Sequence, residues 1–94
     1  MAAYLVGNIT VKNDELWQEY VAGVQDSLIP FAAKIVFRGK LAAVLAGEHE
    51  YDLVVVIEFP DLPTLDNWFL SEKYQSLIPL RDEAAKVVIT SYKS

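Results

Sequence analysis

The chain has 94 residues, no Cys, a single His and a net charge of −5 at pH 7, and 53% of its residues are hydrophobic. This length predicts one domain, covering residues 1–94. The lack of Cys excludes a disulfide scaffold and a thiolate metal site. The acidic balance argues against nucleic-acid binding, and the apolar content excludes a disordered chain. For so short a chain the composition is unusually hydrophobic, since a small domain leaves much of its surface in water.

The sequence contains no segment typical of a membrane protein. The longest apolar runs, near residues 41–47 and 53–57, are far shorter than the roughly 18 residues that span a bilayer. The first residues carry no basic segment, and Asn8 and Thr10 interrupt any signal-peptide core. We therefore expect a cytoplasmic protein without membrane association.

The first half of the chain predicts a strand, a helix and a second strand. Residues 4–11 have the composition of a strand. Asn13 or Asp14 can cap the helix that follows, which should end before Pro30. The apolar side of this helix recurs at helical spacing, at Trp17, Tyr20, Val21, Val24 and Leu28. Residues 33–38 alternate as the second strand, with Lys34, Val36 and Arg38 on the side opposite to Ile35 and Phe37.

The second half predicts a strand, helical segments and a last strand. Residues 42–46 either continue the second strand or begin a short hairpin, and residues 47–50 form a turn. Residues 53–59 form the strongest strand, which Pro60 ends. Asp61 then caps a helix, a further helical segment runs from residue 71 to residue 86, and residues 87–92 form the last strand. The order β-α-β-β-α-β predicts a ferredoxin-like α+β sandwich, a four-stranded antiparallel sheet with the helices on one face.

The strand at residues 53–59 also predicts a partner. Leu53, Val55, Ile57 and Phe59 form one apolar face, while Val54 and Val56 make the other face apolar up to Glu58. Two helices cover only one face of a sheet. The other face therefore predicts a homodimer that pairs sheet to sheet. The alternative is a monomer with a hydrophobic outer face.

Several segments together resemble the DUF1330 family, whose members are small proteins of unknown function in the dimeric α+β barrel superfamily. The resemblance rests on residues 35–39, 45–47, 55–60 and 71–81, including Glu-Phe-Pro at 58–60 and Pro-Leu-Arg at 79–81, and covers nearly the whole chain. The family often has a Gly-Gly pair where this chain has Ala32 and Ala33, and a second Gly where it has Lys40. The resemblance implies two sheets packed face to face. The superfamily includes cofactor-free monooxygenases, but a shared fold does not transfer an activity.

Arg38 and Glu58 are charged residues on strands that we expect to be neighbours, and strand parity places both among Val residues. A charge on an apolar strand face needs a partner or solvent. The pair is therefore either a ligand-facing Arg with a catalytic or positioning carboxylate, or a structural ion pair at the dimer interface. Asn8 either joins this cluster or faces solvent.

Arg81, which follows Tyr74 on the predicted helical segment, is a candidate for binding an anionic ligand because Arg pairs bidentately with carboxylates. The alternative is an Arg that braces the last helix. Tyr74 either offers a hydroxyl to a pocket or packs on the sheet. Aromatic side chains of the two helical regions either fill the core or line a ligand pocket; they are Trp17, Tyr20, Trp68 and Phe69.

No cofactor or metal site is predicted. His49 lies in a turn between Glu48 and Glu50, and adjacent turn residues rarely converge on one ion. The helical segment at residues 74–86 has no His to ligate haem, and no Gly-rich phosphate loop is present.

Three functions remain open at this point. The first is a homodimer that binds a small, partly apolar or anionic molecule between helices and sheet, through Arg38, Tyr74, Arg81, Asn8, Trp68 and Tyr20. The second is a cofactor-independent isomerase or monooxygenase-like enzyme with Glu58 as its base. The third is a structural or regulatory dimer without a ligand.

Overall fold

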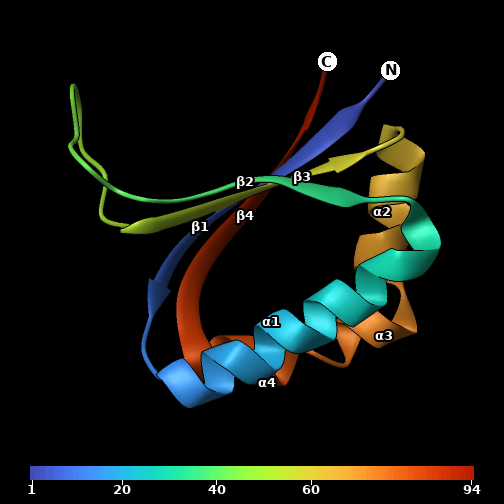
Figure 1. Ribbon diagram of the computed structural model, residues 1–94, viewed down its shortest axis with the longest axis horizontal. Helices are drawn as coiled ribbons and strands as arrows, with labels where there is room; N and C mark the ends of the chain where they lie inside the picture. Colours follow the sequence, from blue (N-terminus) through green and yellow to red (C-terminus); the bar gives the residue numbers. More distant parts are fainter.

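The computed structural model describes all 94 residues and confirms the ferredoxin-like α+β fold. The elements are β1 (Ala3–Val11), α1 (Asp14–Leu28), the short 3-10 helix η1 (Ile29–Phe31), β2 (Lys34–Lys40), β3 (Leu53–Phe59), α2 (Leu62–Leu70), α3 (Glu72–Gln75), α4 (Ile78–Ala84) and β4 (Ala85–Lys93). The four strands form one antiparallel sheet in the order β2-β3-β1-β4. Figure 1 shows the sheet with all the helices on one side of it. No helix is long and apolar enough to cross a membrane.

The helix boundaries follow the predicted capping residues. The Asn13 side chain accepts a hydrogen bond from the Leu16 backbone N–H at 3.0 Å, which starts α1. The Asp61 carboxylate accepts one from the Thr64 backbone N–H at 2.8 Å, which starts α2. The second helical region is divided into three short helices, with Ser71 capping α3. Strand β4 begins at Ala85, two residues before the predicted start.

One face of the sheet is covered and the other is open. The odd-numbered residues of β1 from Ala3 to Ile9 are buried beneath the helices. The core around them contains Phe59, Trp68 and Tyr74, which are almost completely buried. The opposite face has no cover within the chain, and it leaves Phe37 and Tyr92 each 55% exposed. Strand β3 thus has two apolar faces, as predicted, and the helices cover only one of them.

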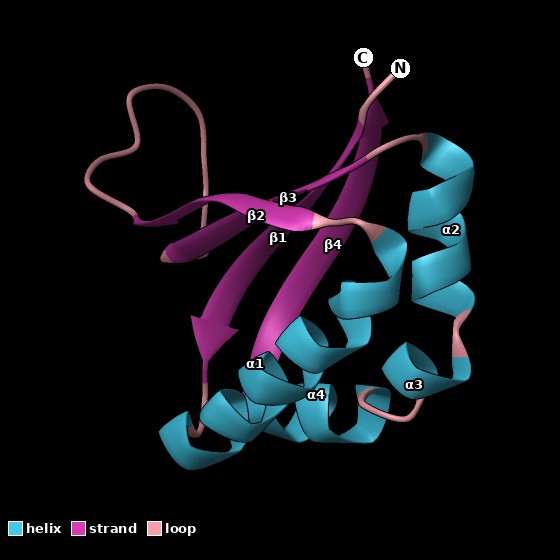
Figure 2. Ribbon diagram, turned by 45° about the vertical axis from the view of Figure 1, so that its right-hand side comes forward, coloured by secondary structure: helices cyan, strands magenta, loops and turns pink.

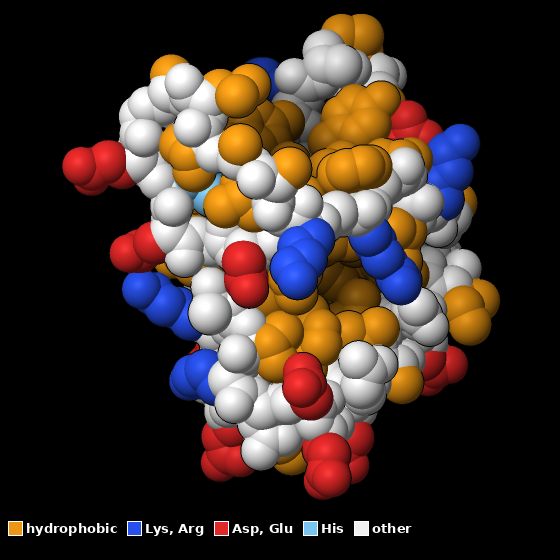
Figure 3. Space-filling view, turned by 60° about the vertical axis from the view of Figure 1, so that its left-hand side comes forward, with side chains coloured by type: hydrophobic (Ala, Val, Ile, Leu, Met, Phe, Trp, Pro, Cys, Tyr) orange, Lys and Arg blue, Asp and Glu red, His pale blue; other side chains and the backbone are white.

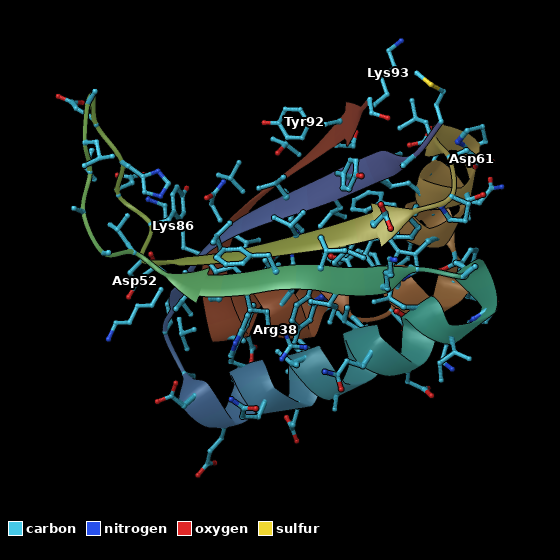
Figure 4. All side chains as sticks on the ribbon, turned by 45° about the horizontal axis from the view of Figure 1, so that its top comes forward. Arg38, Asp52, Asp61, Lys86, Tyr92 and Lys93 are labelled. Atoms are coloured by element: carbon cyan, nitrogen blue, oxygen red, sulfur yellow. The ribbon has the colours of Figure 1, made fainter.

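A β-bulge in β2 corrects the predicted orientation of Arg38. The pairing of β2 with β3 shifts between Ile35 and Phe37, so Val36 is the extra residue. Phe37 therefore pairs with Val56 on the open face, and Arg38 pairs with Val55 on the covered face. Figure 4 shows Arg38 on the side of β2 that faces α1, with Tyr92 on the other side of the sheet. Arg38 and Glu58 thus lie on opposite faces, although their strands are neighbours as predicted.

Two connections differ from the expectation in detail. Residues 41–52 form neither a strand nor a short hairpin but a long loop that projects from the sheet (Figure 2). Near the end of this loop, the Lys86 ammonium pairs with the Glu50 carboxylate at 3.0 Å.

Ala32, between η1 and β2, adopts the left-handed conformation with φ of 52°. A side chain there is unfavourable, because only Gly adopts this conformation routinely.

Candidate ligand-binding site

A cavity of about 420 Å³ lies between α1 and the covered face of the sheet. Helix α1 packs mainly against α4 and α3 rather than on the strands, which leaves space beneath it. Gly7 of β1 lines this space and adds no side chain to fill it. Of the 20 lining residues 14 are hydrophobic, so the walls suit an apolar molecule. The volume is within the range of about 300–1,000 Å³ that small-molecule sites occupy.

The only charged residues that line the cavity are Arg38 and Lys40, both on β2. Neither forms an ion pair within the chain, and both side chains are exposed. Gln18 and Gln25 of α1 add uncharged polar groups to the lining. Figure 3 shows basic side chains bordering a hollow with apolar walls. A protein of net charge −5 thus presents two unpaired cations at an apolar cavity.

A chain of hydrogen-bonded polar groups connects Tyr20 of α1 with Tyr74 of α3 and Arg81 of α4. The Tyr20 and Tyr74 hydroxyl oxygens are 2.8 Å apart, and the Arg81 Nη1 donates to the Tyr74 oxygen at 3.1 Å. Tyr20 lines the cavity, whereas Tyr74 and Arg81 lie behind it. Burial raises the pKa of the Tyr20 phenol, and the neighbouring Tyr74 raises it further. Tyr20 therefore remains a protonated phenol at neutral pH.

Trp68 of α2 lines the same cavity and is held in place by a hydrogen bond. Its indole Nε1–H donates to the Ser27 hydroxyl at 2.9 Å, and the Ser27 hydroxyl donates to the Val24 carbonyl at 2.7 Å. The Trp68 ring also packs on Tyr74, with 4.4 Å between the ring centroids. Because these contacts fix the ring, this part of the wall is preorganised before any ligand binds.

Glu58 and Asn8 lie on the open face, away from this cavity. Asn8 pairs with Val54 of β3 and Val88 of β4. The Glu58 carboxylate accepts a hydrogen bond from the Tyr4 hydroxyl at 2.9 Å and pairs with the Lys34 ammonium at 3.3 Å. The hydrogen bond from Tyr4, followed by the contact with Lys34, lowers the pKa of Glu58. Neither residue lines the cavity, so the structure does not unite the predicted polar site.

The structure brings together three of the predicted ligand-binding residues, Arg38, Trp68 and Tyr20, at the cavity. Tyr74 and Arg81 contribute through the hydrogen bonds behind Tyr20. Sequence reasoning missed Lys40, Gln18 and Gln25. For the two Gln residues a signal existed, because they lie on α1 next to apolar Trp17 and Val24, at the edge of its apolar stripe. Lys40 could have been found only from the position of the bulge in β2, because the bulge turns its side chain to the covered face of the sheet.

Comparison with known proteins identifies the family and the fold. The model of the domain of unknown function DUF1330 matches residues 2–92, and no curated protein matches. RPA0582 of Rhodopseudomonas palustris, a protein of unknown function, is 14% identical with a TM-score of 0.83, over 99% of this chain and 82% of that one. SnoaB of Streptomyces nogalater, a cofactor-independent oxygenase, is 9% identical with a TM-score of 0.69, over 99% of this chain and 92% of that one. A dimeric ferredoxin-like protein of unknown function from Jannaschia sp. CCS1 is 10% identical with a TM-score of 0.69, over the full length of both chains. Identities this low establish similarity of fold alone.

Proposed function

We propose that this chain, which belongs to the DUF1330 family, is a homodimeric binding protein for a small molecule with an apolar body and an anionic group. The apolar body would occupy the cavity between α1 and the sheet. The anionic group would lie at Arg38 and Lys40. The observation that carries this proposal is the pair of unpaired cations beside an apolar cavity.

The electrostatics of the cavity favour an anion over a neutral or cationic ligand. No carboxylate lines the cavity to neutralise Arg38 and Lys40. Arg binds a carboxylate through two parallel hydrogen bonds, and Lys adds a mobile point charge. Apolar walls increase the strength of these contacts, because charges beside a low-dielectric region are screened less than in bulk water.

Binding is the better proposal than catalysis with Glu58 as the base. A general base must reach the proton that it removes, but Glu58 lies on the face of the sheet away from the cavity. Its lowered pKa also makes it a weaker base than an ordinary Glu. The Glu58 carboxylate pairs with the Lys34 ammonium and not with Arg38, its predicted partner, and this contact favours a structural role over catalysis.

The test uses 2-naphthoate as the anionic probe and 2-naphthamide as its neutral match. Trp17 and Trp68, the two Trp residues of the chain, both line the cavity. Their indole N–H signals in an NMR titration therefore report binding at this site. We expect 2-naphthoate to shift both signals. We expect 2-naphthamide to bind about tenfold more weakly, because it lacks one charge-assisted contact. Equal binding of the two probes would contradict the role of the cations.

Matched variants separate the two parts of the site. Arg38→Gln and Lys40→Gln should each weaken 2-naphthoate binding, whereas Lys93→Gln, at the far end of β4 (Figure 4), should leave it unchanged. Val21→Trp should block the cavity, because Val21 lines it, whereas Ala22→Trp places the same ring on the exposed side of α1. If Val21→Trp binds 2-naphthoate as tightly as the wild-type protein does, the ligand does not bind in this cavity.

The open face of the sheet supports the homodimer. Val6 and Val56 pair at the middle of this face, beside the exposed Phe37. Large exposed apolar patches are typical of protein interfaces. In a two-fold dimer the open sheet faces of the two copies would cover each other. The similar Jannaschia protein is described as dimeric, which supports a dimeric state for this chain.

Light scattering tests the dimer. We expect twice the chain mass of 10.5 kDa for the wild-type protein. Val56→Asp places an unpaired charge in the proposed interface and should give the monomer mass, while Ala22→Asp adds the same charge to an exposed position of α1 and should remain dimeric. A wild-type mass of 10.5 kDa would refute the proposed pairing of sheets.

A further inference from the structure

The protons of Tyr20 and Tyr74 can be assigned from their surroundings. Tyr74 is 0% exposed, so its hydroxyl proton must be donated within the protein, because a buried donor without an acceptor is costly. The groups within hydrogen-bond distance of the Tyr74 oxygen are the Arg81 guanidinium and the Tyr20 hydroxyl. Arg has no acceptor. The Tyr74 hydroxyl therefore donates to the Tyr20 oxygen.

This assignment determines what the Tyr20 hydroxyl can do. Only one proton lies between the two phenol oxygens, and Tyr74 supplies it. The hydrogen bond with Tyr74 is the one that the Tyr20 hydroxyl forms within the chain, so the Tyr20 proton then has no acceptor there. Of the three residues in this chain of hydrogen bonds, Tyr20 is the one that lines the cavity, so a water or a ligand in the cavity could accept this proton.

We propose that Tyr20 is a specificity-determining hydrogen-bond donor of the cavity, which selects ligands with an acceptor oxygen, such as a ketone, on their apolar body. Arg81 and Tyr74 orient and polarise this donor, since each hydrogen bond in a chain strengthens the next. This inference rests on the proposed binding function and narrows its ligand class to oxo-substituted organic anions. The anionic group lies at Arg38 and Lys40, and the oxo group lies against α1.

A site built to donate a hydrogen bond discriminates strongly against a ligand that lacks the acceptor. A ligand with a methylene group in place of the ketone would leave the Tyr20 proton facing an apolar group and would displace the water that otherwise accepts it. Tyr20 would thus have two roles: its oxygen accepts the proton of the buried Tyr74 hydroxyl, and its own hydroxyl proton would be donated to the ligand.

The first test needs no ligand. The protein is labelled with ¹³C at the Cζ atom of Tyr and observed by NMR in an equal mixture of H₂O and D₂O, where a slowly exchanging hydroxyl splits its Cζ signal in two. Tyr20→Phe and Tyr74→Phe assign the two signals. We expect the Tyr74 signal to be split and the Tyr20 signal to be single, because only the Tyr20 proton reaches the cavity. Any other pattern, including two split or two single signals, means that Tyr20 is not the one accessible hydroxyl of the pair and overturns its role as a donor to the cavity.

The second test measures selectivity with matched probes. The 2-, 3- and 4-benzoylbenzoates carry a carboxylate and a ketone at different separations, and the corresponding benzylbenzoates have CH₂ in place of the ketone. The wild-type protein should bind at least one keto probe about tenfold more tightly than its partner. Tyr20→Phe should bind both members equally, and Tyr51→Phe, outside the cavity, should retain the preference.

The outcomes separate this inference from the proposed function. Equal binding of every pair by the wild-type protein, or a preference that survives in Tyr20→Phe, overturns the role of Tyr20 while the binding function stands. Failure of every aromatic anion to shift the Trp17 and Trp68 signals refutes the binding function itself. In that event the ¹³C experiment still shows which of the two hydroxyl protons exchanges with water.

Discussion

Ser27→Ala tests the hydrogen bond that holds Trp68 in the cavity wall. Ser27 is 1% exposed and Trp68 is 2% exposed, so water cannot replace the lost hydroxyl. The indole N–H would then be buried without an acceptor, which costs about 1–3 kcal/mol. The better helix propensity of Ala returns up to about 0.5 kcal/mol. We expect a net loss of about 1.5 kcal/mol in the free energy of unfolding, which corresponds to about 6–12 °C in Tm.

A double-mutant cycle isolates the hydrogen bond from the other effects of the substitution. In a Trp68→Phe background the indole N–H is absent, so Ser27→Ala should change stability by less than about 0.5 kcal/mol. The measurement is urea unfolding followed by far-ultraviolet circular dichroism, at one fixed protein concentration because a dimer makes stability depend on concentration.

The matched control is Ser76→Ala. The Ser76 hydroxyl also donates to a carbonyl three residues earlier, that of Lys73 at 2.8 Å, but it is exposed and accepts from no Trp. We expect it to cost less than about 0.5 kcal/mol. An equal cost of Ser27→Ala in the wild-type and Trp68→Phe backgrounds would refute the argument.

Two further stability predictions follow from single residues. Ala32→Gly should stabilise the protein by about 0.5–1 kcal/mol in chemical unfolding, because Ala32 has φ of 52°, whereas Ala22→Gly within α1 should destabilise it by about 1 kcal/mol; a loss of stability in the Ala32 variant would contradict the assigned strain. Glu58 has a folded-state pKa below its ordinary value of 4.5, so its stabilisation is present above that pH and is lost as the pH falls through the folded-state pKa. Tyr4→Phe should therefore lower Tm at pH 7, and the difference from wild type should shrink on acidification; a difference independent of pH would contradict this origin.

The sequence by itself determined the elements and their order, because the signals for them are local. The alternation within residues 53–59 places Ile57 and Phe59 on the buried face, as the structure confirms. Asn13 and Asp61 begin helices because each accepts a hydrogen bond from a backbone N–H three residues later. The second face of the same strand is also apolar, and this indicated that one face of the sheet is left uncovered by the chain's own helices. Each of these signals needs only neighbouring residues and the geometry of a strand or helix.

Tertiary structure alone decided which charged residues face the cavity. One extra residue in a strand reverses the orientation of every later side chain, so the bulge at Val36 moves Arg38 to the cavity and leaves Glu58 on the open face. The sequence carries no strong signal for the bulge position, since Val36 is an ordinary strand residue. The Tyr20–Tyr74 hydrogen bond likewise joins residues 54 positions apart. The cavity itself exists because α1 packs on other helices, a contact between distant segments that no local pattern encodes.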